Sequence, residues 1–163
     1  MKVVINACFG GFSLSPKGIA AWAKRKGRPC FFFLNGREDD GSLSLERRVP
    51  CSMEQAGKSG LMFWAYDIPN PEEIFKRAKS WHEMTSEEKA ADNALHDEHD
   101  LCDNGGDIAR DDLDLIAVVE QLGAATNGRC AKLEIVEIPD GTDYVIEEYD
   151  GNEHVAERHR TWG

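Results

Sequence analysis

Apolar residues gather first in two short runs near the start of the chain. Residues 2–9 are rich in Val and Ile and end at Gly10-Gly11, which is typical of a buried strand followed by a turn. Residues 15–27 combine a Ser-Pro start, an apolar stripe and a basic end before a glycine, and they predict a helix. Residues 30–34 form a second apolar run and predict a central strand. Strand, helix and strand in this order predict a parallel βαβ unit with a right-handed crossover.

The middle of the chain alternates polar segments with short apolar ones. Residues 37–60 are polar and rich in Gly and Ser, without a sustained period, and they predict a loop or flap. Residues 61–68 predict a third strand, and residues 70–73 (Asn-Pro-Glu-Glu) predict a helix start. Residues 85–88 (Thr-Ser-Glu-Glu) predict a further helix start that leads into an acidic segment. The Asn-Gly-Gly sequence at residues 104–106 interrupts this segment.

The last third predicts a helix and then an antiparallel meander. Asp111 is a candidate N-cap for a helix that reaches Gln121 and ends at a glycine. Residues 132–138 and 144–148 alternate polar and apolar positions, which predicts an antiparallel pair, and Asp150-Gly151 predicts a hairpin turn into a final strand over residues 153–160. The predicted fold class is therefore α/β, a mixed sheet with an N-terminal parallel βαβ unit and a C-terminal antiparallel meander.

Length and charge limit the class of protein. A chain of 163 residues fits one domain, so we expect residues 1–163 to form a single domain with a variable polar loop at about 37–60. The acidic segment at about 82–114 carries 12 acidic and 2 basic residues, a charge of -10 in a chain whose total is -11. Repulsion from phosphate backbones argues against general nucleic-acid binding. The acidic segment either binds a positively charged groove or is a solvated loop.

Apolar content and cysteine usage favour an intracellular protein. No stretch approaches the roughly 20 apolar residues of a membrane span, and the first residues lack the pattern of a secretory signal. The five cysteines are widely spaced and include no C-x-x-C pair, which fits reduced thiols; Cys8 and Cys30 lie in apolar runs, where a cysteine behaves as a small hydrophobe. We expect a cytoplasmic protein with no cofactor and no membrane partner. Contacts through Trp22, Trp64 or Trp81 leave a homo-oligomer open.

Two parts of the sequence form a recognisable pattern. The first is residues 5–15 (INACFGGFSLS), and the second comprises residues 136–139 (VEIP) and the ending from residues 146–151 (IEEYDG) to residues 159–162 (HRTW). Together they resemble a family of small tailed-phage and prophage proteins whose biochemistry is uncharacterised. The resemblance implies a phage origin and expression in the cytoplasm of an infected bacterium, and it supplies no catalytic residue. Small phage accessory proteins often counteract host immunity, by blocking a defence protein or by sequestering or degrading a nucleotide messenger.

The first candidate site is the junction between the first predicted strand and the helix that follows. Backbone N–H groups, two hydroxyls, a glycine pair and the positive end of a helix dipole would suit a phosphate there. The residues concerned are Gly10, Gly11, Phe12, Ser13 and Ser15. The same residues equally fit a tight turn with an ordinary helix cap. Asn6, an amide inside an apolar strand, would either orient a ligand or tie down the adjacent loop.

The last predicted strand supplies a second candidate site. Alternation along a strand places Arg158, Arg160 and Trp162 on one face. Arginine forks and an aromatic surface suit an anion that carries a ring, such as a nucleotide. The alternative is an exposed hairpin in which Arg158 and Arg160 pair across the strands with Glu147 or Glu148.

Catalytic and metal sites are less well supported than a binding site. Residues 96–103 (HDEHDLCD) offer donor atoms for a divalent metal, but no C-x-x-C or H-E-x-x-H accompanies them, so we favour a solvated acidic segment and expect no metal. The sequence order assembles no Ser/His/Asp or Cys/His triad, so our leading hypothesis is non-catalytic. In this hypothesis the chain is a phage counter-defence protein that sequesters a nucleotide-like anion between the first and second candidate sites. The alternatives are an acidic inhibitor of a host defence protein, possibly a nucleic-acid mimic, and a small nucleotide-processing enzyme.

Overall fold

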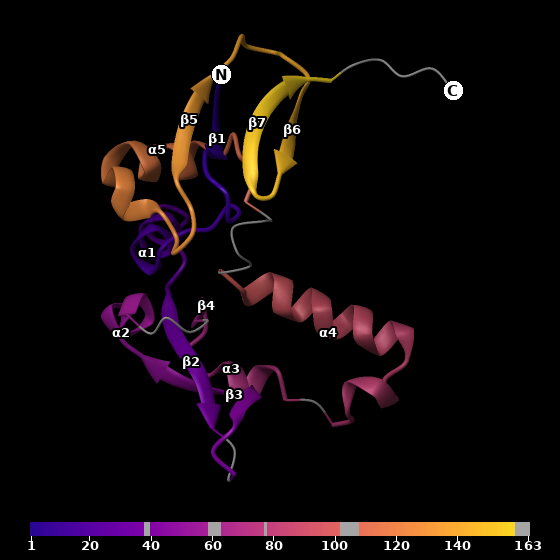
Figure 1. The fold of residues 1–163 in the computed structure, drawn as a ribbon. Helices are drawn as coiled ribbons and strands as arrows, with labels where there is room; N and C mark the ends of the chain where they lie inside the picture. Colours follow the sequence, from indigo (N-terminus) through magenta and orange to yellow (C-terminus); the bar gives the residue numbers. More distant parts are fainter. Residues whose placement is uncertain (38–39, 59–62, 77, 102–107, 159–163) are drawn as a thin grey trace. The chain divides into compact units, whose positions relative to one another are not determined.

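The computed structural model describes residues 1–37, 40–58, 63–76, 78–101 and 108–158. The chain divides into two compact units (Figure 1). Unit 1 comprises Met1–Gly27 and Asp103–Gly163, and unit 2 comprises Arg28–Cys102. Within the described ranges, five α-helices accompany seven strands, and every strand pairing is antiparallel. None of the helices described is both long enough and apolar enough to cross a membrane.

Unit 1 is built around a buried first strand. Strand β1 (Lys2–Asn6) pairs with β5 (Leu133–Glu137), and residues 3–6 are all buried. Strands β6 (Tyr144–Tyr149) and β7 (Asn152–Glu157) form a hairpin that lies beside β1 on the side away from β5 (Figure 1). The continuous apolar run in β1 therefore reflects a strand with neighbours on both sides.

Two helices of unit 1 pack together and run antiparallel. Helix α1 (Pro16–Arg25) begins at Ser15, whose Oγ accepts the N–H of Gly18 at 3.0 Å, as the sequence predicted. The backbone N–H of Ser15 also donates to Thr126 in the short helix η2 (Gly123–Thr126). Because η2 directly follows helix α5 (Leu113–Leu122), the start of α1 lies at the end of α5.

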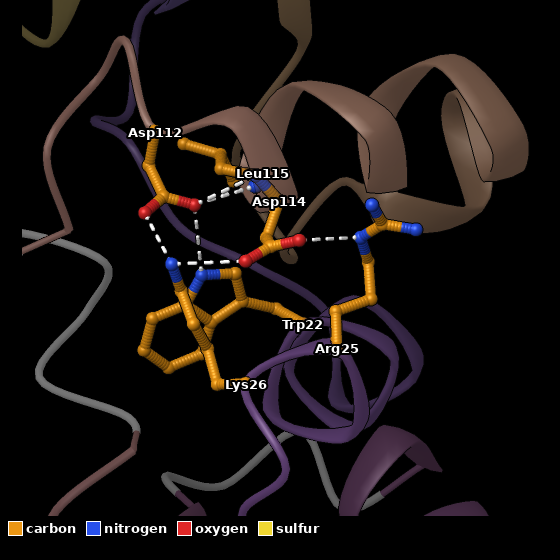
Figure 2. Close-up of polar contacts among 6 residues, drawn as sticks. All are labelled: Trp22, Arg25, Lys26, Asp112, Asp114 and Leu115. Atoms are coloured by element: carbon orange, nitrogen blue, oxygen red, sulfur yellow. Dashed lines mark hydrogen bonds and ion pairs between the residues drawn. The ribbon is translucent and has the colours of Figure 1, made fainter.

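A charged cluster joins the other ends of the same two helices (Figure 2). Asp112 caps α5 through Oδ1, which accepts the N–H groups of Asp114 and Leu115 at 3.0 and 2.9 Å. Its Oδ2 accepts Lys26 Nζ at 2.6 Å, and Asp114 pairs with Arg25 at 2.9 Å. The basic end of α1 and the acidic start of α5 thus complement both helix dipoles.

Asp112→Ala is expected to destabilise unit 1 by about 1–2 kcal/mol, because it removes a helix cap together with a partner of Lys26. Burial alone would raise the pKa of Asp112, but hydrogen bonds from Lys26 and the Leu115 N–H outweigh it and hold the pKa below its ordinary value. This carboxylate therefore stabilises the fold above its unfolded pKa, and the contribution is lost as the pH falls through the folded pKa. Urea unfolding at pH 7 and pH 3 should show a difference between wild type and variant that shrinks at the lower pH.

Unit 2 has a small sheet with the aromatic strand at its centre. Strand β2 (Phe31–Arg37) pairs with β3 (Leu43–Cys51) on one edge and β4 (Phe63–Tyr66) on the other, which confirms its predicted central place. Helix α2 (Met53–Lys58) packs on β2. After α3 (Pro71–Ile74), the ring of Phe75 lies 5.2 Å from that of Tyr66. The acidic segment then supplies η1 (Trp81–Glu83) and α4 (Ser86–His99).

The predicted parallel βαβ unit is wrong. Strands β1 and β2 belong to different units, and both pair antiparallel with other strands. Both edges of β2 are filled by β3 and β4, and the partner of β1 comes from the far end of the sequence. An apolar run indicates that a strand is buried, but it does not indicate which strand lies next to it.

The predicted meander is wrong in one of its two pairings. Residues 132–138 and 144–148 are not partners, because β5 pairs with β1. The second pairing is confirmed, since β6 and β7 form a hairpin of six residue pairs. Its turn residues Asp150 and Gly151 have φ values of 51° and 80°, which match the type I′ turn that an Asp-Gly sequence favours.

The loop predicted for residues 37–60 is also wrong, since β3 and α2 occupy most of it. Strand β3 lies at a sheet edge, with Arg47, Val49 and Pro50 exposed, and an edge strand does not need the continuous apolar pattern of a central one. The polar composition of this segment therefore gave no indication of strand β3.

The predicted helix starts are confirmed with small differences. Thr85 caps α4 in a capping box with Glu88. Helix α3 begins at Pro71 as predicted but has only four residues. The cap of α5 is Asp112, one residue after the predicted Asp111. Local capping chemistry is therefore readable in this sequence even where the strand partners are not.

The described cysteines, Cys8, Cys30, Cys51 and Cys130, are free thiols. Burial raises the pKa of the Cys30 thiol to about 11. The thiol therefore stays protonated at neutral pH and behaves as a small apolar side chain, in line with the sequence-based expectation.

Candidate functional site

The segment after β1 and the turn between β6 and β7 meet in unit 1. We call residues 8–13, which follow β1, the glycine loop. Its Gly10 N–H donates to the carbonyl of Asp150 in the hairpin turn at 3.2 Å. A Cβ added at Gly151 would overlap the backbone nitrogen of Gly11 and lie 2.8 Å from that of Gly10. The absence of a side chain at Gly151 thus allows the turn and the glycine loop to touch, which a larger residue there would not permit.

Asn6 is the buried base of this junction. Its side chain is fully buried, and Nδ2 donates to the carbonyls of Cys8 at 2.7 Å and Gly151 at 2.6 Å. Its Oδ1 accepts the backbone N–H of Lys132 at 2.8 Å. One amide therefore joins the glycine loop, the hairpin turn and the segment before β5. Of the two roles predicted for Asn6, the structure supports tying down the loop.

A largely buried ion pair lies at the edge of β1 that faces β7. Glu153 on β7 accepts two hydrogen bonds from the Arg110 guanidinium, each 3.0 Å long, and the backbone N–H of Asn6 at 2.8 Å. The Glu153 side chain is 8% exposed and that of Arg110 is 15% exposed. The guanidinium lies 3.4 Å above the centre of the Phe12 ring, and the Arg110 carbonyl accepts the N–H of Val4. Glu153, Arg110 and Phe12 therefore have structural roles here.

Several hydrogen-bond donors of the predicted anion site are already engaged within the protein. Gly10 donates to Asp150, and the N–H groups of Ser15 and Gly18 are both engaged as described above. Ser15 Oγ also donates to the Ala125 carbonyl at 2.6 Å, and the carbonyl of Ser13 accepts the N–H of Gly128. The start of α1 is thus covered by η2 and the segment after it. Anion binding at this loop stays a prediction, and the N–H groups of Gly10, Ser15 and Gly18 are already engaged within the protein.

Of the second predicted site the structure describes Arg158 alone, and this residue lies far from the first site. Arg158 donates through Nε to Asp143 Oδ1 at 3.1 Å, at the open end of the hairpin. The turn at Asp150 lies at the other end, six residue pairs away, a separation of about 20 Å. The expected partner of Arg158 was Glu147 or Glu148, but its ion-pair partner is Asp143, and Glu147 lies 3.0 Å from His154. Arg160 and Trp162 lie outside the described residues.

In unit 2, the inward side of α4 is held by its two histidines. The His96 ring stacks on Phe75, with centres 3.8 Å apart. His99 Nδ1 lies 2.8 Å from Asp67 Oδ1, and Arg28 donates to the other oxygen at 2.9 Å. Burial would raise the pKa of Asp67, but the bonds from His99 and Arg28 outweigh it and keep the pKa low. These contacts leave the opposite side of α4 facing solvent.

The outward side of α4 is acidic. The helix carries five acidic residues and one lysine among 14, and none of its residues is buried. Glu87, Asp97 and Glu98 are exposed. Among the residues whose positions are described, no group of His, Cys, Asp and Glu is arranged to hold a metal ion, while Cys102 and Asp103 of the predicted donor segment lie outside them.

The partners that form the ion pair of the junction were not predicted from the sequence. Arg110 and Glu153 are 43 residues apart, and neither stands in a motif. Glu153 had one usable signal. A charged residue close to a hairpin turn needs a counter-charge if its strand packs against a buried strand. The exposure of Phe9 and Tyr149 had no signal in the sequence, because Phe9 ends an apolar run and Tyr149 follows a predicted strand, where aromatic residues are common.

Comparisons with protein-family models, with curated proteins and with solved structures find no match to this chain. The junction and the helix α4 are therefore interpreted from their own chemistry.

Proposed function

We propose that this protein is a non-enzymatic inhibitor that covers a positively charged surface of a host protein with the outward face of α4. The supporting observation is the two-sided character of this helix. Its inward side is fixed by His96 on Phe75 and by His99 on Asp67, and its outward side exposes Glu87, Asp97 and Glu98. The acids are therefore presented on an ordered helix.

The physical basis is charge complementarity over a defined length. Glu87 and Glu98 are 11 residues apart, a separation of about 16 Å along the helix axis and just over three turns, so they lie on the same side. A basic groove of similar length, such as one that normally holds a phosphate backbone, would be steered toward this side and covered by it. The net charge of -11 strengthens this attraction at long range.

The test removes the three exposed charges from α4. Wild type and the variant Glu87→Gln, Asp97→Asn, Glu98→Gln are expressed in bacteria that each carry one defence system, and phage plating is measured. We expect wild type to restore plating against at least one system and the variant to lose at least tenfold of that effect. The matched control removes three exposed acids from unit 1 instead, Glu120→Gln, Glu137→Gln and Glu157→Gln, and should keep the effect.

A second arm separates this proposal from nucleotide sequestration and from catalysis. Purified protein is incubated with cyclic nucleotides and ADP-ribose derivatives, and both protein and mixture are examined by mass spectrometry. The proposal expects no retained ligand and no product. Retained, unaltered ligand together with a fully active α4 variant would replace it with sequestration, and product formation would indicate an enzyme.

A further inference from the structure

The junction of unit 1 displays two large aromatic side chains to solvent. Phe9 in the glycine loop is 64% exposed, and Tyr149 at the end of β6 is 80% exposed. No other Phe, Tyr or Trp in the described part of the chain is as exposed as either. Each precedes one end of the hydrogen bond between Gly10 and Asp150, so the two lie on neighbouring segments. We call Phe9, Tyr149 and Asp150 the aromatic tip.

The backbone that carries the aromatic tip is held on both sides. Before Phe9, the carbonyl of Cys8 accepts Asn6 Nδ2, and after it Gly10 donates to Asp150. Tyr149 lies opposite Asn152 in the hairpin ladder. A partner that covers these rings therefore has little backbone to order, and rigid aromatic anchors of this kind carry much of the energy of protein interfaces.

Charge on the tip indicates the sign of the partner. Asp150 is exposed, and no ion pair joins it to a basic residue in the part of the chain that the structure describes. The basic residues next to Cys130 are engaged elsewhere. Lys132 forms an ion pair with Glu134 at 2.6 Å, and Arg129 makes a contact of its own. The uncompensated charge at the tip is therefore negative.

We infer that the aromatic tip is a docking surface for a basic protein segment that places an apolar side chain against Phe9 and Tyr149 and a neighbouring Lys or Arg against Asp150. All residues of the aromatic tip belong to unit 1, whereas α4 belongs to unit 2. It goes beyond the proposed function by naming a second contact region and the chemistry of the segment that fits it.

The test uses synthetic 15-residue peptides of designed composition, and affinity is measured by fluorescence anisotropy at 50 and 300 mM salt. One set has a central Leu or Trp flanked by Arg and Lys, a second has the same centre flanked by Glu, and a third has the basic flanks with a central Ser. The basic set with an apolar centre should bind wild type best, and its affinity should fall with salt. Phe9→Ser with Tyr149→Ser should weaken this binding at least tenfold.

A matched control is Leu113→Ser, which removes another side chain that is 80% exposed in unit 1 but is not part of the tip, and it should bind as wild type does. Circular dichroism checks that the tip variant remains folded. The inference is overturned if no peptide of the basic set binds, if acidic and basic flanks bind equally, or if the tip variant binds unchanged. Since α4 is intact throughout, these outcomes do not depend on the charge test of that helix.

Discussion

Glu153→Ala is expected to lower the free energy of unfolding of unit 1 by about 3–5 kcal/mol, the cost of leaving a buried partner charge unpaired. The variant would leave the Arg110 guanidinium, 15% exposed, without its carboxylate, and the Asn6 N–H without an acceptor. Urea unfolding followed by circular dichroism measures the loss. Hydrogen exchange at residues 3–6 shows whether the loss falls on β1, because protection can differ from one part of a protein to another.

The matched control lies on the same strand. Glu157→Ala removes an exposed carboxylate from β7 and should change the free energy of unfolding by less than about 0.5 kcal/mol. Combining Glu153→Leu with Arg110→Met should recover part of the stability lost in Glu153→Ala, since no unpaired charge then remains buried. An equal loss in Glu157→Ala, or none in Glu153→Ala, would contradict a buried role for this pair.

The contrast between local and distant features explains how much of the fold could be predicted. The cap at Ser15, the capping box at Thr85 and the hairpin turn at Asp150 each depend on a few adjacent residues, and all three follow from sequence. The partner of β1 depends on a contact across more than 120 residues, and several pairings satisfy the same apolar pattern. Strand existence was therefore predictable for β1, while sheet topology was not.

The candidate site shows the same limit in chemical terms. Gly10 and Ser15 suit a phosphate only if their N–H groups stay free, and the sequence contains no sign that Asp150 and Thr126 accept them. Asn6 is the informative exception, because a buried amide must find partners wherever it lies. The sequence thus indicated that something is tied down at Asn6, and the structure identifies the tied segments as the glycine loop and the hairpin turn.

The buried amide of Asn6 should be the most charge-sensitive position of the junction. Asn6→Asp keeps the shape but turns a donor into an acceptor that faces the carbonyls of Cys8 and Gly151. We expect it to destabilise unit 1 by more than about 3 kcal/mol at pH 7, because a buried charge meets two carbonyl oxygens. Asn6→Ala should cost about 2–4 kcal/mol, since it leaves two carbonyls and the N–H of Lys132 without partners.

The pH dependence of this destabilisation distinguishes a charge effect from a purely steric one. Burial and the facing carbonyls raise the pKa of a carboxyl at position 6 above its unfolded value, so the folded state of this variant binds the extra proton more tightly. Its deficit relative to wild type should therefore shrink as the pH falls from 7 to 5, when a protonated carboxyl can again donate to one carbonyl. Asn127→Asp is the control, because Asn127 Oδ1 only accepts the N–H of Leu133 and a carboxylate accepts it equally well. A deficit in Asn6→Asp that does not change with pH, or an equal one in Asn127→Asp, would show that the Asn6 amide does not hold the glycine loop against the hairpin turn.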